Sequence, residues 1–382
     1  MKIAIVTNIL TPYRIFFYKK LNEYLLNKNI KFKVYVMSET ESNRNWYYDQ
    51  YKTDFTELLE KKISYNDNIF INKDVKKKLK EFSPNIIIAA GAYQMPTILY
   101  LMYLKKKLNF KLIFWSESNL IKKENLTGFK KRLREIIRNT TYKKFDGFWY
   151  SGKFSKEFIE KYSRKNTELY FLPNLIDNSL YSNVINIKNN NYDNLIEKYN
   201  INKNKTVFIC PARLSPQKGI LEFLNLLKNC KNKNKASILI AGDGELYDEI
   251  NSFIIENKDI DVRLIGYKEQ DEIIELYSIA NFFLLPSIED PNPLTCIEAL
   301  WSGLPLLISS HVGNSPEVLI NEKNGYLFDY NDIEKSIINI EKAINSDEKW
   351  LSNASKISMK IAKDKYFPDK AISECINEML EK

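Results

Sequence analysis

Two cations follow an apolar run over 206–211 that predicts a strand buried on both faces. Arg213 and Lys218 lie in the loop after this run, just before a helical pattern begins. Arginine offers a planar fork of donors and lysine a compact charge, so together at the carboxyl end of a strand they predict a clamp for a diphosphate. The alternative is that both are ordinary exposed cations of a loop.

A helix start is predicted at the same edge of the sheet. Asn292 suits the cap, Pro293 the first helical position and Gly303 the stop. The first N–H groups of a helix lack partners and its dipole is positive there, so this point should bind an anion. Asp290 and Glu298 lie eight residues apart on either side of it. Helical side chains lean toward the N-terminus, so the Glu298 carboxylate should reach back toward the bound group.

Weaker signals follow three further predicted strands. Gly242 allows a ligand to approach the backbone closely, although such turns are common after parallel strands. Gly266 and Tyr267 either offer backbone groups and a ring to a nucleobase or simply pack as a turn. His311 fits an ordinary loop residue better than a ligand contact. It is the only histidine, which excludes a multi-histidine metal centre.

Polar groups also follow the strands of the N-terminal half. The first loop between a strand and a helix holds Asn8, Tyr13 and Arg14. Glu117 follows a strand predicted over 111–115. If the two sheets oppose each other, these side chains face the cleft where tandem domains of this kind bind ligands.

Strands alternate with helical segments, which predicts an α/β protein with mostly parallel sheets. At 382 residues, two domains are the default. We expect a Rossmann-like domain over 1–180, a junction over 181–205, a second such domain over 206–355 and a C-terminal helix over 356–382 that returns to the first. The expected strands are 2–7, 32–37, 85–90, 111–115, 146–150, 168–172, 206–211, 237–242, 261–266, 281–286 and 304–309.

Charge is unevenly distributed along the chain. Residues 1–180 carry 34 lysines and arginines against 18 aspartates and glutamates, a net +16, whereas the remainder is net −7. So basic an N-terminal half indicates an anionic partner such as a membrane surface. The alternative is that its lysines only lie on solvent-exposed faces without binding anything. The stretch 122–144 combines nine basic residues with an apolar stripe, which is typical of a membrane-surface helix or of a core-facing helix with a basic back.

Other classes of protein are disfavoured by what the sequence lacks. No nucleic-acid-reading motif accompanies the positive charge. The four cysteines have no metal-type spacing and are expected to be reduced, buried thiols of a cytoplasmic protein. Residues 1–7 predict a strand rather than a cleavable leader, and no apolar run is long enough to cross a bilayer.

Taken together, these segments resemble the retaining glycosyltransferases of family 4, whose GT-B fold has two Rossmann-like domains facing a central cleft. The resemblance covers about residues 205–330 and, more loosely, the whole chain. It rests on segments that are specific only in combination: Arg213-Leu214, Lys218-Gly219, Ala241 to Gly244, Phe283 to Ser287, Asp290 to Ala299, Ser302 to Pro305 and Gly325 to Leu327.

The resemblance implies roles for the donor-binding residues. Arg213 and Lys218 would hold the diphosphate of a nucleotide sugar, as would the N–H groups near Leu294 and Thr295, which follow Pro293. Glu298 would bind the ribose hydroxyls, with Gly242, Gly266 and Tyr267 near the donor and its base. Asp290 would lie at the donor sugar. The family usually has glutamate at that position, so the neighbouring Glu289 is a second candidate.

The N-terminal domain would bind the acceptor through Asn8, Tyr13, Arg14 and Glu117. Two features depart from the family: the first loop has no glycine, and no histidine reaches the donor sugar from this domain. Glu117 stands at the level where that histidine is usual.

The implied activity is metal-independent transfer of a sugar, without a cofactor, from a nucleoside diphosphate donor to a glycan or lipid-linked acceptor. UDP-sugars are favoured over GDP-sugars as donors, and cell-surface polysaccharide such as lipopolysaccharide or capsule is the expected pathway. We expect a cytoplasmic protein at the inner face of the membrane. The alternatives are a nucleotide-sugar epimerase of related fold and a non-catalytic protein that binds nucleotide sugars or membrane surfaces.

Overall fold

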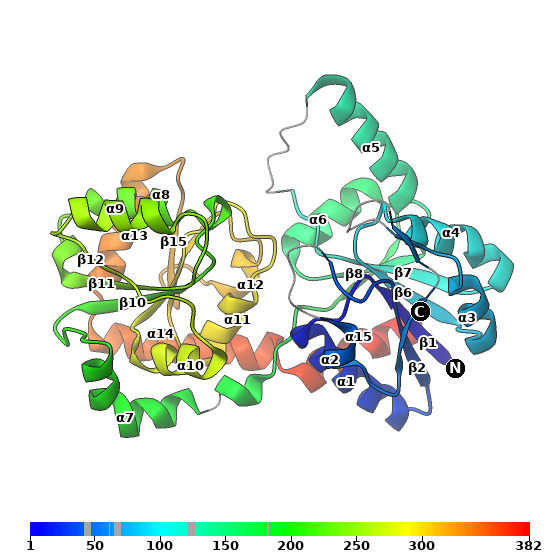
Figure 1. Ribbon diagram of the computed structural model, residues 1–382, viewed down its shortest axis with the longest axis horizontal. Helices are drawn as coiled ribbons and strands as arrows, with labels where there is room; N and C mark the ends of the chain where they lie inside the picture. Colours follow the sequence, from blue (N-terminus) through cyan, green and yellow to red (C-terminus); the bar gives the residue numbers. More distant parts are fainter. Residues whose placement is uncertain (42–46, 61, 65–69, 121–126, 182) are drawn as a thin grey trace. The chain divides into compact units, whose positions relative to one another are not determined.

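Two parallel β-sheets organise the chain, one in each of two units (Figure 1). The computed structural model describes residues 1–41, 47–60, 62–64, 70–120, 127–181 and 183–382. Unit 1 comprises Met1–Pro173 and Pro368–Lys382, and unit 2 comprises Asn174–Phe367. Since each sheet is parallel throughout, each gathers the carboxyl ends of its strands, and the loops that follow them, at one edge.

Unit 1 is built on a seven-stranded sheet in the order β3-β2-β1-β6-β7-β8-β9. The strands are β1 (Lys2–Thr7), β2 (Lys31–Val36), β3 (Thr56–Leu58), β6 (Ile86–Ala90), β7 (Lys111–Ser116), β8 (Gly147–Tyr150) and β9 (Glu168–Phe171). The helices are α1 (Pro12–Asn27), α2 (Tyr48–Tyr51), α3 (Val75–Phe82), α4 (Pro96–Leu108), α5 (Gly128–Tyr142), α6 (Lys153–Tyr162) and α15 (Pro368–Glu381). A separate antiparallel pair consists of β4 (Lys62–Ser64) and β5 (Phe70–Asn72).

Unit 2 has a six-stranded parallel sheet in the order β12-β11-β10-β13-β14-β15. The strands are β10 (Thr206–Pro211), β11 (Ala236–Ala241), β12 (Asp261–Leu264), β13 (Phe282–Leu285), β14 (Leu306–Ser309) and β15 (Gly325–Phe328). The helices are η1 (Asn178–Tyr181), α7 (Val184–Lys198), η2 (Pro216–Lys218), α8 (Ile220–Lys228), η3 (Lys233–Lys235), α9 (Tyr247–Glu256), α10 (Gln270–Ile279), α11 (Leu294–Trp301), α12 (Ser315–Val318), α13 (Ile333–Ile344) and α14 (Glu348–Lys365).

Apolar burial on both faces of each sheet explains the near-continuous hydrophobic strands. All residues of β6, β11, β13 and β14 are buried. In unit 2, alternate residues of these strands enter two separate cores, one on each side of the sheet. This arrangement is the doubly covered parallel sheet that the sequence predicts.

The segment expected as a linker over 181–205 instead belongs to unit 2. Its described part is mostly the helix α7, and Val184, Leu195 and Ile196 are buried in the core of that unit. The asparagine-rich composition concealed this helix, because its polar residues occupy the exposed side while a few apolar ones pack inward.

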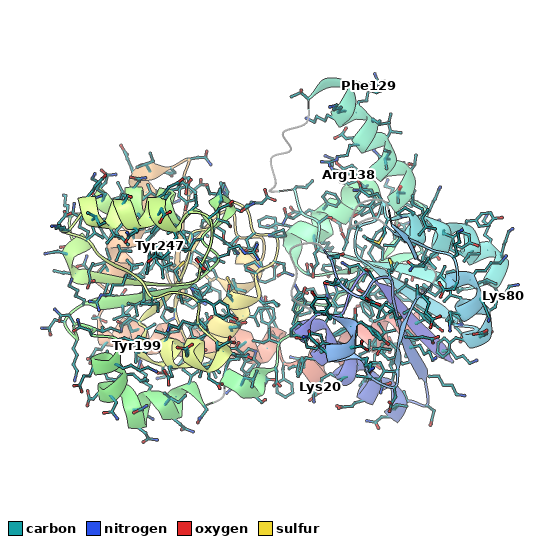
Figure 2. The ribbon with its side chains drawn as sticks, in the orientation of Figure 1. Lys20, Lys80, Phe129, Arg138, Tyr199 and Tyr247 are labelled. Carbon is teal, nitrogen blue, oxygen red and sulfur yellow. The ribbon has the colours of Figure 1, made fainter. Side chains whose placement is uncertain are left out.

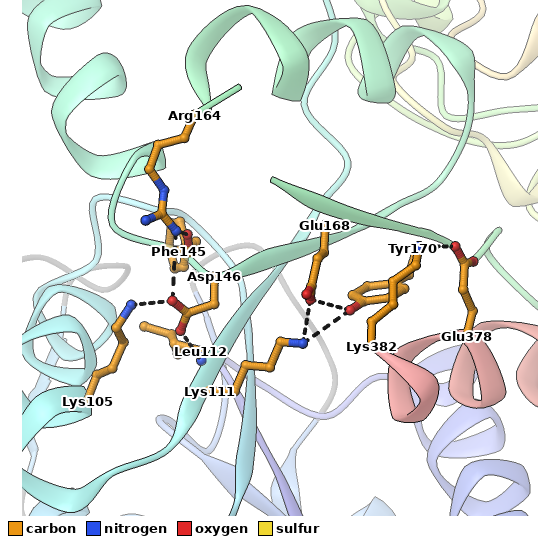
Figure 3. Close-up of polar contacts among 10 residues, drawn as sticks. All are labelled: Lys105, Lys111, Leu112, Phe145, Asp146, Arg164, Glu168, Tyr170, Glu378 and Lys382. Atoms are coloured by element: carbon orange, nitrogen blue, oxygen red, sulfur yellow. Dashed lines mark hydrogen bonds and ion pairs between the residues drawn. The ribbon is translucent and has the colours of Figure 1, made fainter. Parts of the chain in front are cut away.

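The C-terminal segment that returns to unit 1 begins at Pro368 rather than at the expected residue 356. Residues up to Lys365 belong to α14 in unit 2, and α15 belongs to unit 1. Proline cannot continue a helix, so a new one begins there. Just after α15, the Lys382 Nζ lies 5.4 Å from the ring centre of Tyr170 in β9, beside the contact between Lys111 and Glu168 (Figure 3). Among the described helices, none is long and apolar enough to span a bilayer.

Candidate active site

The loops after β10 and β13 are fastened to each other through their main chains. The backbone N–H groups of Ile288 and Glu289 both donate to the carbonyl of Gln217, at 2.8 and 3.1 Å. One residue further, the N–H of Gly313 donates to the carbonyl of Asp290 at 2.8 Å. Three strand-end loops of unit 2 therefore form one continuous edge.

Glycines make this close approach of the loops possible. A Cβ on Gly242 would come within 1.9 Å of the Ala212 carbonyl oxygen. Gly219 has a φ of +61°, and a Cβ there would come within 2.3 Å of the Pro286 carbonyl oxygen. At Gly242 the backbone closely approaches the neighbouring loop at Ala212, next to Arg213, whereas the sequence predicted an approach to a ligand.

Lys218 and Asp290 form an ion pair at this edge. The Lys218 Nζ lies 2.5 Å from the Asp290 Oδ2, and both side chains are largely buried. Lys218 ends the short η2 helix, which Pro216 starts and the left-handed Gly219 stops. The carboxylate that contacts this ammonium group is that of Asp290.

Arg213 lies five residues before Lys218 in the same loop. Its side chain is exposed, and no hydrogen bond or ion pair joins its guanidinium to another described residue. The two cations therefore differ: Lys218 is held in place by a carboxylate, whereas Arg213 is open to an incoming anion.

The helix start expected at Pro293 lies one residue later. α11 begins at Leu294, and Pro293 occupies the cap with an extended ψ of 127°. Asn292 was expected to cap the helix. No side chain caps it; separately, the buried side chain of Asn314 donates to the Pro293 carbonyl at 3.0 Å. The N–H groups of Leu294 and Thr295 precede the intrahelical ladder and so lack partners within the helix.

The stop expected at Gly303 is confirmed. Ser302 is the C-terminal cap of α11, and Gly303 follows it with a φ of +71°. A left-handed residue after the last turn is the usual end of a helix, and glycine adopts it without a steric penalty.

Two tyrosines hold the Glu298 carboxylate. The Tyr277 hydroxyl in α10 donates to Glu298 Oε2 at 3.0 Å. Tyr181 in η1 also hydrogen-bonds the carboxylate, and Gln270 approaches the Tyr181 hydroxyl at 3.4 Å. Burial raises the pKa of Glu298 above its ordinary value, and the two tyrosine hydroxyls offset part of this rise.

Tyr181 and Tyr277 were not among the sequence-predicted site residues. Tyr277 belongs to the buried face of α10 and is only 1% exposed. A buried tyrosine hydroxyl needs a polar partner, so a tyrosine on the apolar face of a predicted helix was the one sequence feature that could have pointed to this contact. Tyr181 lay in the expected linker, where the sequence pattern indicated no packed helix.

Gly266 and Tyr267 follow β12, which ends at Leu264 rather than at Gly266. Gly266 has a φ of +74°, and a Cβ there would meet no neighbouring atom. Tyr267 is 69% exposed. Glycine is therefore favoured at position 266 by the backbone conformation alone, and the Tyr267 ring is free to contact a ligand.

In unit 1, three predicted residues gather where β1 and β7 end. The Arg14 Nη2 lies 2.8 Å from the Glu117 Oε1. The guanidinium carbon of Arg14 stacks 3.7 Å from the centre of the Trp115 ring and lies 5.5 Å from that of Tyr13. Asn8 makes a separate contact, donating from Nδ2 to the Glu41 Oε1 at 2.6 Å.

The family model for glycosyl transferases group 1 matches residues 191–357. This segment, less than half of the chain, is similar to that family. The match confirms the resemblance to a glycosyltransferase that the sequence predicts, while assignment to family 4 stays a prediction.

Individual relatives agree with the family model. The chain is 31% identical over 189 residues to the UDP-Gal:alpha-D-GlcNAc-diphosphoundecaprenol alpha-1,3-galactosyltransferase of Escherichia coli, covering 48% of this chain and 47% of that protein. The chain spans about half the length of the curated relatives it matches.

Solved structures share the fold along the whole chain. The lipopolysaccharide outer core galactosyltransferase WaaB superposes with a TM-score of 0.74 at 16% identity, over 100% of this chain and 99% of that one. Anabaena HepE in complex with UDP and glucose gives a TM-score of 0.69 at 14% identity, again over 100% and 99%. The fold is therefore GT-B, with a Rossmann-like sheet in each unit.

The glycosyl transferases group 1 match covers one set of candidate residues and not the other. Every candidate residue of unit 2, from Arg213 to Glu298, lies within 191–357. The candidates of unit 1, namely Asn8, Tyr13, Arg14 and Glu117, lie outside it. The match thus supports the proposed donor-side residues more strongly than the acceptor-side ones.

Proposed function

We propose that the protein is a retaining glycosyltransferase that transfers a sugar from a nucleoside diphosphate sugar, preferably a UDP-sugar, to a hydroxyl of a glycan or lipid-linked acceptor. The observation that carries the proposal is the arrangement around Lys218. An ammonium group paired with Asp290, an exposed arginine in the same loop and a helix start meet at one edge of a sheet in a family of glycosyltransferases. The name of the Escherichia coli relative, with its UDP donor and lipid diphosphate acceptor, supports the donor and acceptor classes.

The transfer breaks the bond between the anomeric carbon and the diphosphate oxygen and forms one from that carbon to the acceptor oxygen on the same face. Negative charge builds on the leaving diphosphate. Arg213, Lys218 and the first N–H groups of α11 stabilise this charge, which is how an enzyme lowers the barrier without a protein nucleophile. The departing phosphate oxygen takes the acceptor's proton. Metal independence is part of the proposal, since these cations supply the charge.

Glu298 binds the ribose hydroxyls of the donor in this scheme. A carboxylate is an acceptor with two oxygens, and Tyr277 and Tyr181 leave it acceptor capacity for a further donor. Asp290 orients Lys218 and lies at the donor sugar, while Tyr267 contacts the base. Arg14 and Glu117 bind the acceptor.

The place of action follows from the acceptor. A glycan intermediate of cell-surface polysaccharide is carried on a lipid, so the protein would act at the cytoplasmic face of a membrane. The basic character of residues 1–180 supports an anionic membrane surface as a partner.

The test is to incubate the protein with UDP-sugars and GDP-sugars and a membrane extract, with and without EDTA. We expect transfer of one UDP-sugar to a lipid-extractable product that survives EDTA. Conversion of the donor without any acceptor would show an epimerase instead, and donor binding without turnover would show a non-catalytic protein. Loss of all activity on chelation would refute metal independence alone.

A further inference from the structure

The apolar stripe of α5 points away from the protein. Phe129, Leu133, Ile136 and Ile137 recur at helical spacing and are between 40% and 79% exposed. In Figure 1 this helix projects from the rest of unit 1, and Figure 2 shows Phe129 at its outer end. A water-soluble helix normally buries such a stripe, so the orientation needs a partner.

The opposite side of α5 holds it to the protein. Thr141 and Tyr142 are buried. The guanidinium carbon of Arg138 lies 5.2 Å from the ring of Phe158 and 5.7 Å from that of Tyr162, both in α6. The core-facing alternative left open by the sequence is therefore wrong: α5 packs through its C-terminal turn and a basic residue, not through its apolar stripe.

The positive charge of α5 indicates what kind of partner covers its apolar stripe. α5 carries five basic residues, Lys130, Lys131, Arg132, Arg134 and Arg138, against the one acid Glu135. At about 100° per residue, Lys130 and Arg132 flank the apolar stripe on its two sides. A second copy of the chain would bring the same positive charge against it. An anionic lipid surface offers both a negative headgroup layer and an apolar layer beneath.

We propose that α5 is the element that binds the protein to a membrane, lying in the interface of an anionic bilayer with Phe129, Leu133, Ile136 and Ile137 below the headgroups. At 15 residues the helix is about 22 Å long, too short to span the hydrocarbon core and suited to lying in its surface. Lys122 and Lys123, part of the basic stretch seen in the sequence, lie outside the described residues. The inference rests on the membrane partner proposed above, but it requires no step of sugar transfer.

The test measures co-sedimentation of the full chain with phosphatidylcholine vesicles, with and without phosphatidylglycerol. We expect binding only when phosphatidylglycerol is present. The double variant Phe129→Ser/Leu133→Ser should bind at least about tenfold more weakly, because two apolar side chains lose their burial. Lys130→Gln and Arg132→Gln should each weaken binding about fivefold, and added salt should mimic them.

The matched control is Ile338→Ser. Ile338 is 54% exposed on α13 of unit 2, far from α5 in sequence, and its replacement should leave binding unchanged. Equal binding of the double variant and the parent, or equal binding to neutral and anionic vesicles, would overturn the proposal. So would a self-association, seen by sedimentation velocity, that the double variant abolishes.

A fluorescent probe gives an independent readout. The four native cysteines are all buried, so Phe129→Cys supplies a selectively reactive thiol for an environment-sensitive dye. Its emission should shift to the blue with anionic vesicles, whereas a dye on Ile338→Cys should not respond. Sugar transfer to a water-soluble acceptor is measured in parallel. Vesicle binding without any turnover would refute the proposed function and leave this inference standing.

Discussion

The loops after β10 and β13 in unit 2 are joined through their main chains, whereas the loops after β1 and β7 in unit 1 meet through side chains. In unit 2, Gln217 accepts two backbone N–H groups from the loop after β13, and Gly242 and Gly219 permit the approach. In unit 1, the contacts at the ends of β1 and β7 are the pair of Arg14 with Glu117 and the stacking on Trp115.

This difference is consistent with the proposal that the two units bind different substrates. A main-chain framework fixes positions whatever the neighbouring side chains are, which fits a nucleoside diphosphate that all donors share. Side-chain pairs can change without altering the fold, which fits acceptors that differ from one enzyme to another. The following predictions test that division, from the largest expected effect to the smallest.

Lys218→Ala should cause the largest loss of activity. Removing one group that stabilises the transition state lowers kcat by about 10²–10³-fold, and here Asp290 would also be left without its partner. Steady-state kinetics with the preferred UDP-sugar measures the effect. The control is Lys349→Ala, an exposed lysine of α14 that should keep the parent rate. A Lys218→Ala enzyme with nearly the parent kcat would show that the pair is only structural.

Gly242→Ala should destabilise unit 2. The new Cβ would lie 1.9 Å from the Ala212 carbonyl oxygen, which cannot move without its loop. We therefore expect the free energy of unfolding to fall by about 3 kcal/mol, near the upper end of the cost of overpacking. Gly128→Ala in unit 1 is the comparison, because its φ of +58° is strained but its surroundings are open; about 1 kcal/mol is expected there. Urea unfolding measures both, and equal losses would contradict the steric argument.

The sequence predicts some strands and helices of this fold better than others. Strands buried on both faces have continuous apolar runs, so β10 was predicted within its true bounds and β13 and β14 within two residues. β3 and β15 were missed; they are edge strands of three and four residues. α7 was missed because asparagine dominates its composition.

Within the site, positions are predictable but pairings are not. Strand-end position and residue type pointed to Lys218, Asp290 and Glu298 separately. Nothing in their spacing shows that the first two form an ion pair, or that Tyr277 and Tyr181 enclose the third. Such contacts join segments that are tens of residues apart, and only the folded register brings them together.

Glu298→Gln should weaken donor binding about tenfold to a hundredfold, the value of a hydrogen bond to a charged group. The pKa of Glu298 is raised above 4.5, so the parent should lose donor affinity as the pH falls through that raised pKa, and the variant should not. Stability has the opposite sign. The folded state takes up this proton more readily than the unfolded state, so the carboxylate costs stability at neutral pH and the cost disappears in acid.

Titration calorimetry with UDP across this pH range, alongside thermal unfolding, separates the two effects. Glu298→Gln should be at least as stable as the parent at neutral pH while binding UDP less well. A variant that loses stability and affinity together would indicate that Glu298 serves packing with Tyr277 rather than the donor.

Glu117→Gln should give the smallest effect and the one most specific to unit 1. The change keeps the shape of the side chain but removes the charge that holds Arg14 at 2.8 Å, so the acceptor KM should rise about tenfold while the donor KM stays constant. Glu57→Gln is the control, since Glu57 also pairs with basic residues of unit 1, Lys33 at 2.8 Å and Lys78 at 2.5 Å, but lies on β3. A rise in donor KM would instead place Glu117 beside the donor sugar, at the level where the family usually has a histidine. The proposed division between the two units would then fail at this residue.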